Sequence, residues 1–287
     1  MLQQPLSYLD PEFLDSDEGR PIRLLSEYLD PLRRFRDQKI QDTVVFFGSA
    51  RVDSRERAER ALKTLKARGV HDADAHYETE LQKVSKAVEW ARYYEDAREL
   101  ARLLAEWTLT LQSDNHRFVV TSGGGPGIME AANRGAHEAG GKTIGLNIRL
   151  PFEQGANPYI TEGLHFEFHY FFMRKFWFAY LAKALVVFPG GFGTLDEMFE
   201  ILTLVQTDKL SKKIGVVLYG REYWKEVLDL KPMAEWGAIA EKDLELLHYA
   251  DTPADAFAHL RDHLIAHHLE SQSAQEAATP GIAKTRG

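Results

Sequence analysis

One stretch of the chain restricts the possible folds more than any other. Residues 184–197 read Ala-Leu-Val-Val-Phe-Pro-Gly-Gly-Phe-Gly-Thr-Leu-Asp-Glu, and the five apolar residues at the start predict a buried parallel strand. A glycine turn follows, and Thr194 is the expected N-cap of a helix whose first turn carries Asp196 and Glu197. This geometry aims backbone N–H groups and a helix dipole at a ligand, so it predicts a phosphate site in an α/β protein.

A second glycine turn supports this prediction. Residues 118–122 form an apolar strand that leads into Gly123-Gly124-Gly125-Pro126-Gly127 and a helix, while a strand at 43–47 ends in Gly48-Ser49. In an alternating strand–helix chain, right-handed crossovers place such turns on the same edge of a parallel sheet. Ligands collect at that edge. We therefore expect one set of residues beside the phosphate loop: Ser49, Gly124, Gly125 and Gly127.

The rest of the chain indicates how the domain is organised. Further strands are predicted at 143–148, 164–168 and 214–219. The predicted fold is an α/β, Rossmann-like, doubly wound parallel sheet with a helical N-terminal arm and a long helical insert. Residues 1–42 form the arm, with short helices at 22–29 and 31–38, and residues 43–268 form the nucleotide-binding domain. The insert includes an amphipathic helix at 77–111, and residues 269–287 are expected to be a disordered tail.

Composition excludes several classes of function. The net charge is −8 and no sustained Lys/Arg stripe exists, which argues against nucleic acid as the main ligand. The chain has no cysteine, so disulfides and thiolate sites are excluded. No apolar run is long enough to span a membrane, and the first residues do not resemble a signal peptide, so a cytoplasmic protein is expected.

Several side chains could carry chemistry. Arg174 and Lys175 interrupt the apolar run 166–181, and they lie either in the pocket or on a solvated helix edge. Asp196 and Glu197 point about 100° apart on a helix, so at most one of them faces the site, and both could simply complement the dipole. His165 and His169 have no third ligand, which favours structural roles, and no metal is expected.

Together these motifs resemble the LOG (LONELY GUY) family of phosphoribohydrolases, long mislabelled lysine decarboxylases. Residues 189–197 resemble its Pro-Gly-Gly-x-Gly-Thr-x-x-Glu motif, residues 123–129 its first glycine motif, and Arg174-Lys175 its Arg-Lys pair. The arm and the insert are more similar to the longer bacterial branch. The resemblance implies a Rossmann-like enzyme without a cofactor, which hydrolyses the N-glycosidic bond of a nucleoside 5′-monophosphate such as AMP.

The resemblance also implies roles for individual residues. Arg174 and Glu197 would be the catalytic pair. The 5′-phosphate would be held by Gly190, Gly191, Gly193 and Thr194, and further substrate contacts would come from Glu153, Lys175 and Thr203.

Other interpretations remain open from the residues alone. A non-catalytic carrier of a nucleotide or phosphorylated cofactor could use the same glycine turns, although it would not need the Arg174/Glu197 pair. A lysine decarboxylase would need a lysine that forms a Schiff base with pyridoxal phosphate, and Lys175 and Lys183 lack that context. The apolar surface of 77–111 and the aromatic cluster 166–178 predict a homodimer or larger homo-oligomer with the site near the interface.

Overall fold

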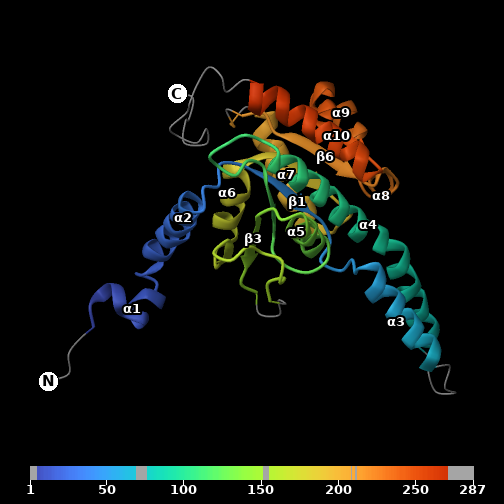
Figure 1. The fold of residues 1–287 in the computed structure, drawn as a ribbon, viewed down its shortest axis with the longest axis horizontal. Helices are drawn as coiled ribbons and strands as arrows, with labels where there is room; N and C mark the ends of the chain where they lie inside the picture. The colour runs from blue at the N-terminus through green and yellow to red at the C-terminus, as the bar shows by residue number, and fades with distance from the viewer. Residues whose placement is uncertain (1–4, 69–75, 151–154, 208, 211, 271–287) are drawn as a thin grey trace.

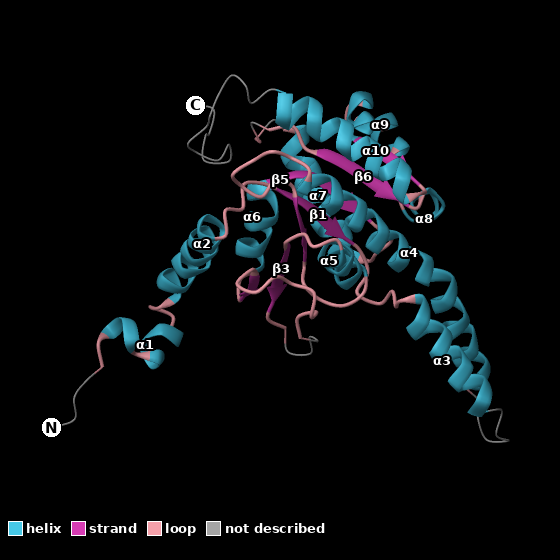
Figure 2. Ribbon diagram, viewed as in Figure 1, coloured by secondary structure: helices cyan, strands magenta, loops and turns pink. Residues whose placement is uncertain are grey.

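A seven-stranded, fully parallel sheet forms the centre of the molecule (Figures 1 and 2). The structure is a computed structural model that describes residues 5–68, 76–150, 155–207, 209–210 and 212–270. The strand order is β4-β3-β2-β1-β5-β6-β7, which confirms the expected Rossmann-like, doubly wound α/β class. The strands are β1 Thr43–Phe47, β2 Val119–Ser122, β3 Thr143–Ile148, β4 His165–Phe168, β5 Ala182–Val187, β6 Gly215–Tyr219 and β7 Leu247–Ala250.

Helices cover both faces of this sheet. Alternate residues of β1 point into two separate hydrophobic cores, one on each face of the sheet. Val45 and Phe47 join the core under α2, α6, α7 and α8. Val44 and Phe46 join the core under α4, α5 and α10. The helices are α1 Pro11–Asp15, α2 Arg20–Asp37, α3 Arg55–Arg68, α4 Tyr77–Leu109, α5 Ile128–Glu138, α6 Phe171–Leu181, α7 Phe192–Gln206, α8 Arg221–Val227, α9 Lys231–Glu235 and α10 Pro253–Leu264, with short 3₁₀ or π segments η1 Ser7–Leu9, η2 Glu241–Leu246 and η3 Ile265–Leu269. Of these, β7, α9 and η2 were not anticipated from the sequence.

The strand order reverses between β1 and β5, and this switch point positions the candidate site. The chain leaves both strands at the same edge, because they pair in parallel. The Ser49 N–H after β1 donates to the Pro189 carbonyl after β5 at 3.0 Å. Both expected turns therefore begin where an open α/β sheet has its ligand crevice.

The N-terminal arm differs from its prediction. Two short helices were expected around Pro31, but α2 is one continuous helix with Pro31 inside it. Proline has no N–H to donate to the carbonyl four residues earlier, which is that of Glu27. The Trp177 indole N–H of α6 donates to this Glu27 carbonyl at 2.8 Å. A tertiary hydrogen bond thus satisfies the group that Pro31 leaves open, and the helix continues.

The apolar surface that suggested an oligomer is mostly covered within the chain. The second half of α4 packs on α5 and α10, and its first half pairs with α3 in a projecting hairpin (Figure 1). In the cluster 166–178, Phe166, Phe168 and Trp177 are buried. Phe171 and Phe172 of the same cluster are 48% and 52% exposed, and the homo-oligomer stays a prediction. Residues 271–287, most of the expected tail, lie outside the described part of the chain.

No helix among the described residues is both long and apolar enough to cross a membrane.

A buried ion pair ties the N-terminal ends of β1 and β2 together. The Asp42 carboxylate accepts hydrogen bonds from Arg117 Nε at 2.8 Å and from the Phe118 N–H at 2.6 Å. Arg117 also donates to the His268 carbonyl at 2.9 Å, so the last described segment joins the same network. Phe118 has a φ of 53°, a left-handed conformation that a bulky residue adopts only when its surroundings hold it there.

We expect Asp42→Ala to destabilise the fold by about 3–5 kcal/mol, because it leaves the Arg117 guanidinium buried without its counter-charge. Denaturant unfolding measures this loss. Glu56→Ala is the matched control, since it removes an exposed ion pair with Arg60 and should cost less than about 1 kcal/mol. Equal losses in the two variants would contradict the structural role of Asp42.

Candidate functional site

The glycine loop after β5 opens directly into α7. Gly191 is the N-cap, no side chain caps the helix, and the first turn contains no acidic residue. The predictions that Thr194 caps the helix and that Asp196 and Glu197 lie in its first turn are therefore wrong: the helix begins at Phe192, so the acids lie in the second turn. The first N–H groups of α7 have no intrahelical partner and face the switch point, as an anion site requires.

Each of the three glycines of this loop is required, or favoured, for a different physical reason. A Cβ on Gly190 would lie 2.1 Å from the Thr194 Oγ1, so the buried Thr194 side chain requires glycine there. Around Gly191 and Gly193, a Cβ would meet no described atom within 4 Å. The protein itself does not exclude side chains at these two positions. Their glycines are consistent with a ligand that approaches the backbone closely.

The other glycine turn reaches the same place. Gly127 has a φ of 72°, and a Cβ there would lie 2.3 Å from the Ser49 carbonyl oxygen, so only glycine fits. That carbonyl accepts the Ile128 N–H, the first of α5, at 3.1 Å. A Cβ on Gly123 would lie 4.0 Å from Arg174 Nη1. The predicted convergence of the two turns is thus observed, with Ser49 between them and Arg174 beside the second.

Arg174 and Glu197 form an ion pair between α6 and α7. Arg174 Nη2 donates to Glu197 Oε1 at 2.6 Å, and each side chain is only 12% exposed. Helix α6 places Arg174 over the rings of Phe171 and Phe178. Of the two possibilities for Arg174, the solvated helix edge is therefore excluded.

Burial changes the protonation of this pair. It raises the pKa of Glu197 to about 7, and the Arg174 charge opposes the shift without cancelling it, while Asp196 adds to it. Lys175 lies beside the pair and binds Asp196 at 2.8 Å and Glu200 at 3.2 Å. Burial alone would lower the pKa of Lys175, but these two carboxylates raise it. Glu197 is therefore placed to exchange a proton near neutral pH.

Two buried polar atoms at this edge have no partner among the described residues. They are Arg174 Nε and Asn147 Oδ1. Asn147, at the end of β3, is the neighbour of the first glycine turn, because a Cβ on Gly124 would lie 1.9 Å from its Oδ1. Buried polar atoms without partners are rare and require an explanation. A bound ligand or water would supply the missing hydrogen bonds. Sequence reasoning missed Asn147, although a polar residue inside an apolar strand is a usable signal.

Another missed residue is Asn157, which fixes the first glycine turn. Its side-chain amide donates to the carbonyls of Gly124 and Gly125 at 3.0 and 3.1 Å, and to Asn133 Oδ1 at 2.9 Å. The Ser122 hydroxyl donates to the same Asn133 oxygen at 2.7 Å. Asn157, in the connection between β3 and β4, thus fixes the first glycine turn in place. Only the fold brings these positions together, so no local pattern could have identified them.

Tyr223 of α8 contacts the glycine loop after β5 directly. Its hydroxyl donates to the Gly190 carbonyl at 2.8 Å, and its ring packs edge-on against Trp90 of α4 at 5.6 Å between centroids. The N–H of a trans peptide points away from the carbonyl. By holding the Gly190 carbonyl, Tyr223 therefore also sets the direction of the Gly191 N–H. The sequence carries no signal for this contact.

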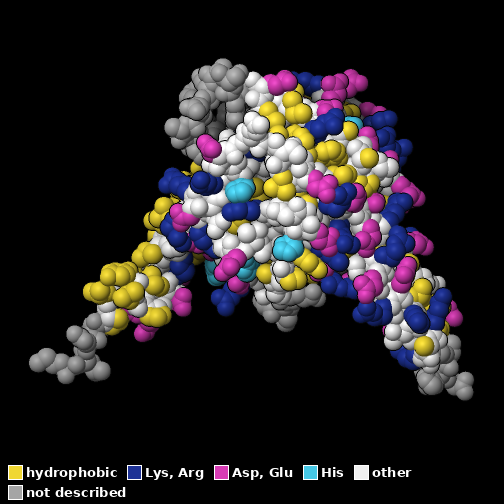
Figure 3. Space-filling view, viewed as in Figure 1, with side chains coloured by type: hydrophobic (Ala, Val, Ile, Leu, Met, Phe, Trp, Pro, Cys, Tyr) yellow, Lys and Arg dark blue, Asp and Glu magenta, His cyan; other side chains and the backbone are white. Residues whose placement is uncertain are grey.

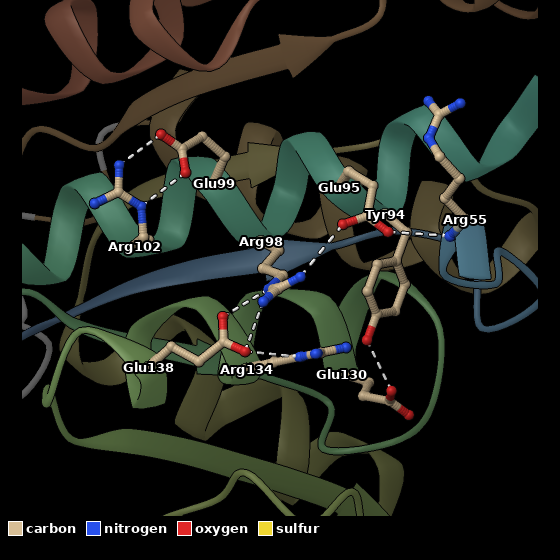
Figure 4. A network of polar contacts seen from close by, with 9 residues as sticks. All are labelled: Arg55, Tyr94, Glu95, Arg98, Glu99, Arg102, Glu130, Arg134 and Glu138. Atoms are coloured by element: carbon tan, nitrogen blue, oxygen red, sulfur yellow. Dashed lines mark hydrogen bonds and ion pairs between the residues drawn. The ribbon is translucent and has the colours of Figure 1, made fainter. Parts of the chain in front are cut away.

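A polar network joins α5 to the insert (Figure 4). The Tyr94 hydroxyl of α4 donates to Glu130 Oε1 in the first turn of α5 at 2.7 Å. Arg98 binds both oxygens of Glu138, at 2.6 and 2.7 Å. Figure 4 shows Arg98 between α4 and α5, with Arg134 on the same Glu138 carboxylate. Since Gly127 is the N-cap of α5 beside the site, this network fixes the position of the first glycine turn.

Thr203 is a predicted residue that the fold does not bring to the pair. Thr203 is exposed, its hydroxyl donates to the Phe199 carbonyl in its own helix, and it lies about 9 Å along α7 from Glu197 at 1.5 Å per residue. Glu153 lies outside the described residues. His165 and His169 are both exposed. Within the described residues, no group of three or more His, Cys, Asp or Glu side chains could hold a metal ion.

Comparisons of the sequence with known proteins agree with the motifs. A protein-family profile described as "Possible lysine decarboxylase" matches residues 129–260, which include Arg174 and Glu197. The cytokinin riboside 5′-monophosphate phosphoribohydrolase LOG of Oryza sativa subsp. japonica is 26% identical over 180 residues, 61% of this chain and 68% of that protein. A cytokinin riboside 5′-monophosphate phosphoribohydrolase of Rhodococcoides fascians is 30% identical over 139 residues, 48% of this chain and 65% of its own length.

Solved structures show only distant similarity. The Moco carrier protein of Chlamydomonas reinhardtii is 21% identical, with a TM-score of 0.44 over 79% of this chain and 99% of that one. The molybdenum cofactor binding protein of Rippkaea orientalis is 20% identical, with a TM-score of 0.42 over 59% of this chain and 86% of its own. With three motifs in order and relatives named as phosphoribohydrolases, the chain is similar to the LOG family.

Proposed function

We propose that the protein hydrolyses the N-glycosidic bond of a nucleoside 5′-monophosphate, AMP or a related purine or cytokinin nucleotide, and releases the free base and ribose 5-phosphate. The observation that carries this proposal is the buried Arg174–Glu197 pair, whose Glu197 lies in the second turn of α7, a helix with an N-terminus open to an anion. The activity named for the rice and Rhodococcoides relatives supports it.

The glycine loop would hold the 5′-phosphate. The free N–H groups at the start of α7, the Thr194 hydroxyl and the positive end of the helix dipole suit a phosphate. Phe192, between two of the glycines, is 93% exposed and offers an aromatic surface beside this site. Ser49, Gly124, Gly125 and Gly127 would line the opposite side. Lys175 would add positive charge, and Glu153 and Thr203 stay predictions as substrate contacts.

The chemistry would depend on Glu197. Cleavage of the bond between C1′ and the base leaves positive charge on the ribose, which a nearby carboxylate stabilises. The same carboxylate accepts a proton from the attacking water. A pKa of about 7 suits that base near neutral pH. Arg174 would orient the carboxylate and donate to ribose oxygens through Nε, which has no partner among the described residues.

The chemistry of a lysine decarboxylase fits this site poorly. A Schiff base needs an unprotonated lysine amine beside the cofactor. Lys175 is bound by two carboxylates that raise its pKa. Burial lowers the pKa of Lys183 and Lys212, but both lie at the amino-terminal edge of the sheet, opposite the glycine turns. The residues present therefore do not fit pyridoxal phosphate.

We expect Glu197→Gln to reduce release of base from AMP by at least about 100-fold, because the variant has no carboxylate to stabilise charge or to accept a proton. Chromatography of free adenine and ribose 5-phosphate measures turnover. Glu200→Gln, on the same helix, is the control and should retain most activity. Unchanged turnover in Glu197→Gln would refute the assignment, and a wild-type protein that binds AMP without cleaving it would be a carrier.

The pH dependence should follow Glu197. The pKa is raised, so the catalytic carboxylate forms only as pH rises through about 7, and kcat/KM, which reports the free enzyme, should increase to a plateau above that value. Asp196→Asn removes a neighbouring negative charge and should move the midpoint to lower pH. A pH–rate profile of both proteins tests this. A midpoint that stays in place or rises in Asp196→Asn would contradict the electrostatic account.

Tyr223→Phe should weaken substrate binding with little effect on kcat. The lost hydrogen bond is worth about 1 kcal/mol, which corresponds to a KM about fivefold higher. Steady-state kinetics separate KM from kcat, and calorimetry measures the affinity of the loop for ribose 5-phosphate directly. Tyr219→Phe, which removes a tyrosine hydroxyl bonded to the Asp251 carbonyl, is the control and should leave this affinity nearly unchanged. Equal affinities in wild type and Tyr223→Phe would show that Tyr223 does not orient the loop.

A further inference from the structure

A cluster of histidines near the end of the described chain has no role in the candidate nucleotide site. Five of the eleven histidines of the protein lie between residues 248 and 268. On the face that Figure 3 draws, by contrast, histidines are visible only at separate points among mixed acidic and basic side chains. Four of the clustered histidines line a cavity of about 650 Å³ between β6, β7, the end of α7 and α10. The cavity lies at the amino-terminal edge of the sheet, opposite the glycine turns, because Gly215 and Leu247 begin β6 and β7.

The lining of this cavity combines bases with an apolar wall. The apolar wall comes from Val205 at the end of α7, from Leu210, and from Leu246 and Leu247 around the start of β7. Among the described residues that line the cavity, Glu245 is the only acid. The bases are His248, His259, His263, His267, Lys212 and Lys213. Such a lining is suited to an anion that carries an apolar body.

The imidazole rings hold fixed positions around the cavity. The rings of His248 on β7 and His259 on α10 stack face to face, with centroids 3.7 Å apart and 5° between their planes. His263 packs onto the start of β6, where a Cβ on Gly215 would lie 2.9 Å from the His263 Cδ2. His248 Nε2 and His263 Nε2 are buried and have no hydrogen-bond partner among the described residues. Buried polar atoms of this kind are rare, and a ligand in the cavity would explain both.

The arrangement of the rings favours an anion over a metal ion. The nitrogen lone pairs of two stacked imidazoles lie in two parallel planes, so the rings of His248 and His259 do not converge on one ion. No group of three or more His, Cys, Asp or Glu side chains in the described part of the chain could hold a metal. An anion needs no such convergence, because each donor can bind a different oxygen atom.

Burial and mutual repulsion keep His263 uncharged at neutral pH. Burial lowers its pKa to about 4, and repulsion from His267 is the next largest cause. His259 and the Lys213 amine add to the shift, whereas the Lys213 backbone opposes it. The charged form of His263 is therefore disfavoured as long as the cavity holds no negative charge.

His259 is affected in the same way. Burial and the stacked His248 lower the pKa of His259, and the carboxylates of Asp255 and Asp262 oppose the shift without cancelling it. The Asp255 carboxylate also lies 4.0 Å from His248 Nε2. An anion in the cavity would favour the charged imidazoles. Its binding and the protonation of the rings would therefore be linked.

We propose that this cavity binds a phosphate monoester with an apolar body, with the phosphate against the imidazoles and Lys213 and the body against the leucines. Near neutral pH a phosphate monoester carries close to two negative charges and has three acceptor oxygens, so it can bind more than one ring. Lys212 contributes less, because its amine already donates to the Ala179 and Tyr180 carbonyls at 2.7 and 2.8 Å. The proposal does not depend on the chemistry at the glycine turns.

Isothermal titration calorimetry of the full chain with phenyl phosphate tests the proposal. At about pH 7.5 the probe is a dianion, because its second pKa is near 6. Titrations in two buffers that differ in ionisation enthalpy count the protons, and we expect an uptake of about one proton at this site as an imidazole becomes charged. Inorganic phosphate should bind at least about tenfold more weakly, because it has no apolar body. Benzoate should also bind at least about tenfold more weakly, because it carries a single charge.

Histidine NMR signals locate the bound probe. This second measurement is needed because, under the proposed function, the glycine loop would bind phenyl phosphate as well. Titration should shift the signals of His248, His259 and His263, which single substitutions assign. The signal of His137, which is exposed on α5 and does not line the cavity, should stay in place.

Glutamine variants separate the charge of the rings from their polarity. His248→Gln combined with His263→Gln keeps polar side chains that cannot take up a proton, so it should weaken binding in the cavity by at least about tenfold and abolish the proton uptake. His137→Gln is the matched control and should change neither. Circular dichroism melting checks that the double variant folds, and His248→Gln alone, on the last strand of the sheet, tests the same point with a smaller change.

Four results would each overturn the proposal. They are histidine signals that phenyl phosphate leaves in place, binding in the cavity without proton uptake, equal affinities in the double variant and His137→Gln, and benzoate that binds as tightly as phenyl phosphate. A Zn²⁺ titration serves as the further check on ligand class. Shifts of the cavity histidines with Zn²⁺ but not with phenyl phosphate would show that the cluster binds a metal ion and not an anion.

Discussion

The ion pair between Arg174 and Glu197 is the contact on which the site depends, because it joins the two helices that flank the switch point. A buried ion pair repays its desolvation only when further hydrogen bonds satisfy the remaining polar atoms. Here Arg174 Nε lacks such a bond, and burial raises the pKa of Glu197 to about 7. The pair thus makes fewer of its possible hydrogen bonds than an ion pair that only stabilises the fold. A bound ligand would supply the missing bonds, which is consistent with a functional role.

Helix α6 transmits the position of the arm to this pair. Glu27 accepts hydrogen bonds at the N-terminus of α6 through its carboxylate, and its carbonyl accepts from Trp177 about two turns later. Arg174 lies between these two contacts. The arm therefore does more than lie on the domain surface, because its central turn fixes both the start and the orientation of α6. Pro31 contributes to this arrangement, since it leaves the Glu27 carbonyl free for Trp177.

The strand–turn–helix units were predictable because their signal is local. Five apolar residues before Pro189 and glycines at fixed offsets determine a buried strand and a tight turn wherever they occur. The pairing of Arg174 with Glu197 followed from the family resemblance, and the structure shows the contact. Local patterns failed where tertiary contacts decide: Pro31 was taken as a helix break, Thr194 as a cap, and Asn157 and Tyr223 were missed. Each of these residues is explained by a partner more than ten positions away or by the exact start of a helix.

The acids of α7 pose an electrostatic question for a phosphate site, and the structure answers it. Asp196, Glu197 and Glu200 carry three negative charges when ionised, and Arg174 and Lys175 supply two positive charges in direct contact with them. One negative charge is left over, and it is removed when Glu197 is protonated near pH 7. The acids also begin in the second turn, so the N–H groups of the first turn remain free for an anion. A phosphate on the loop would raise the pKa of Glu197 further. Cationic charge on the ribose would have the opposite effect, which makes the carboxylate most stable when the bond to the base breaks.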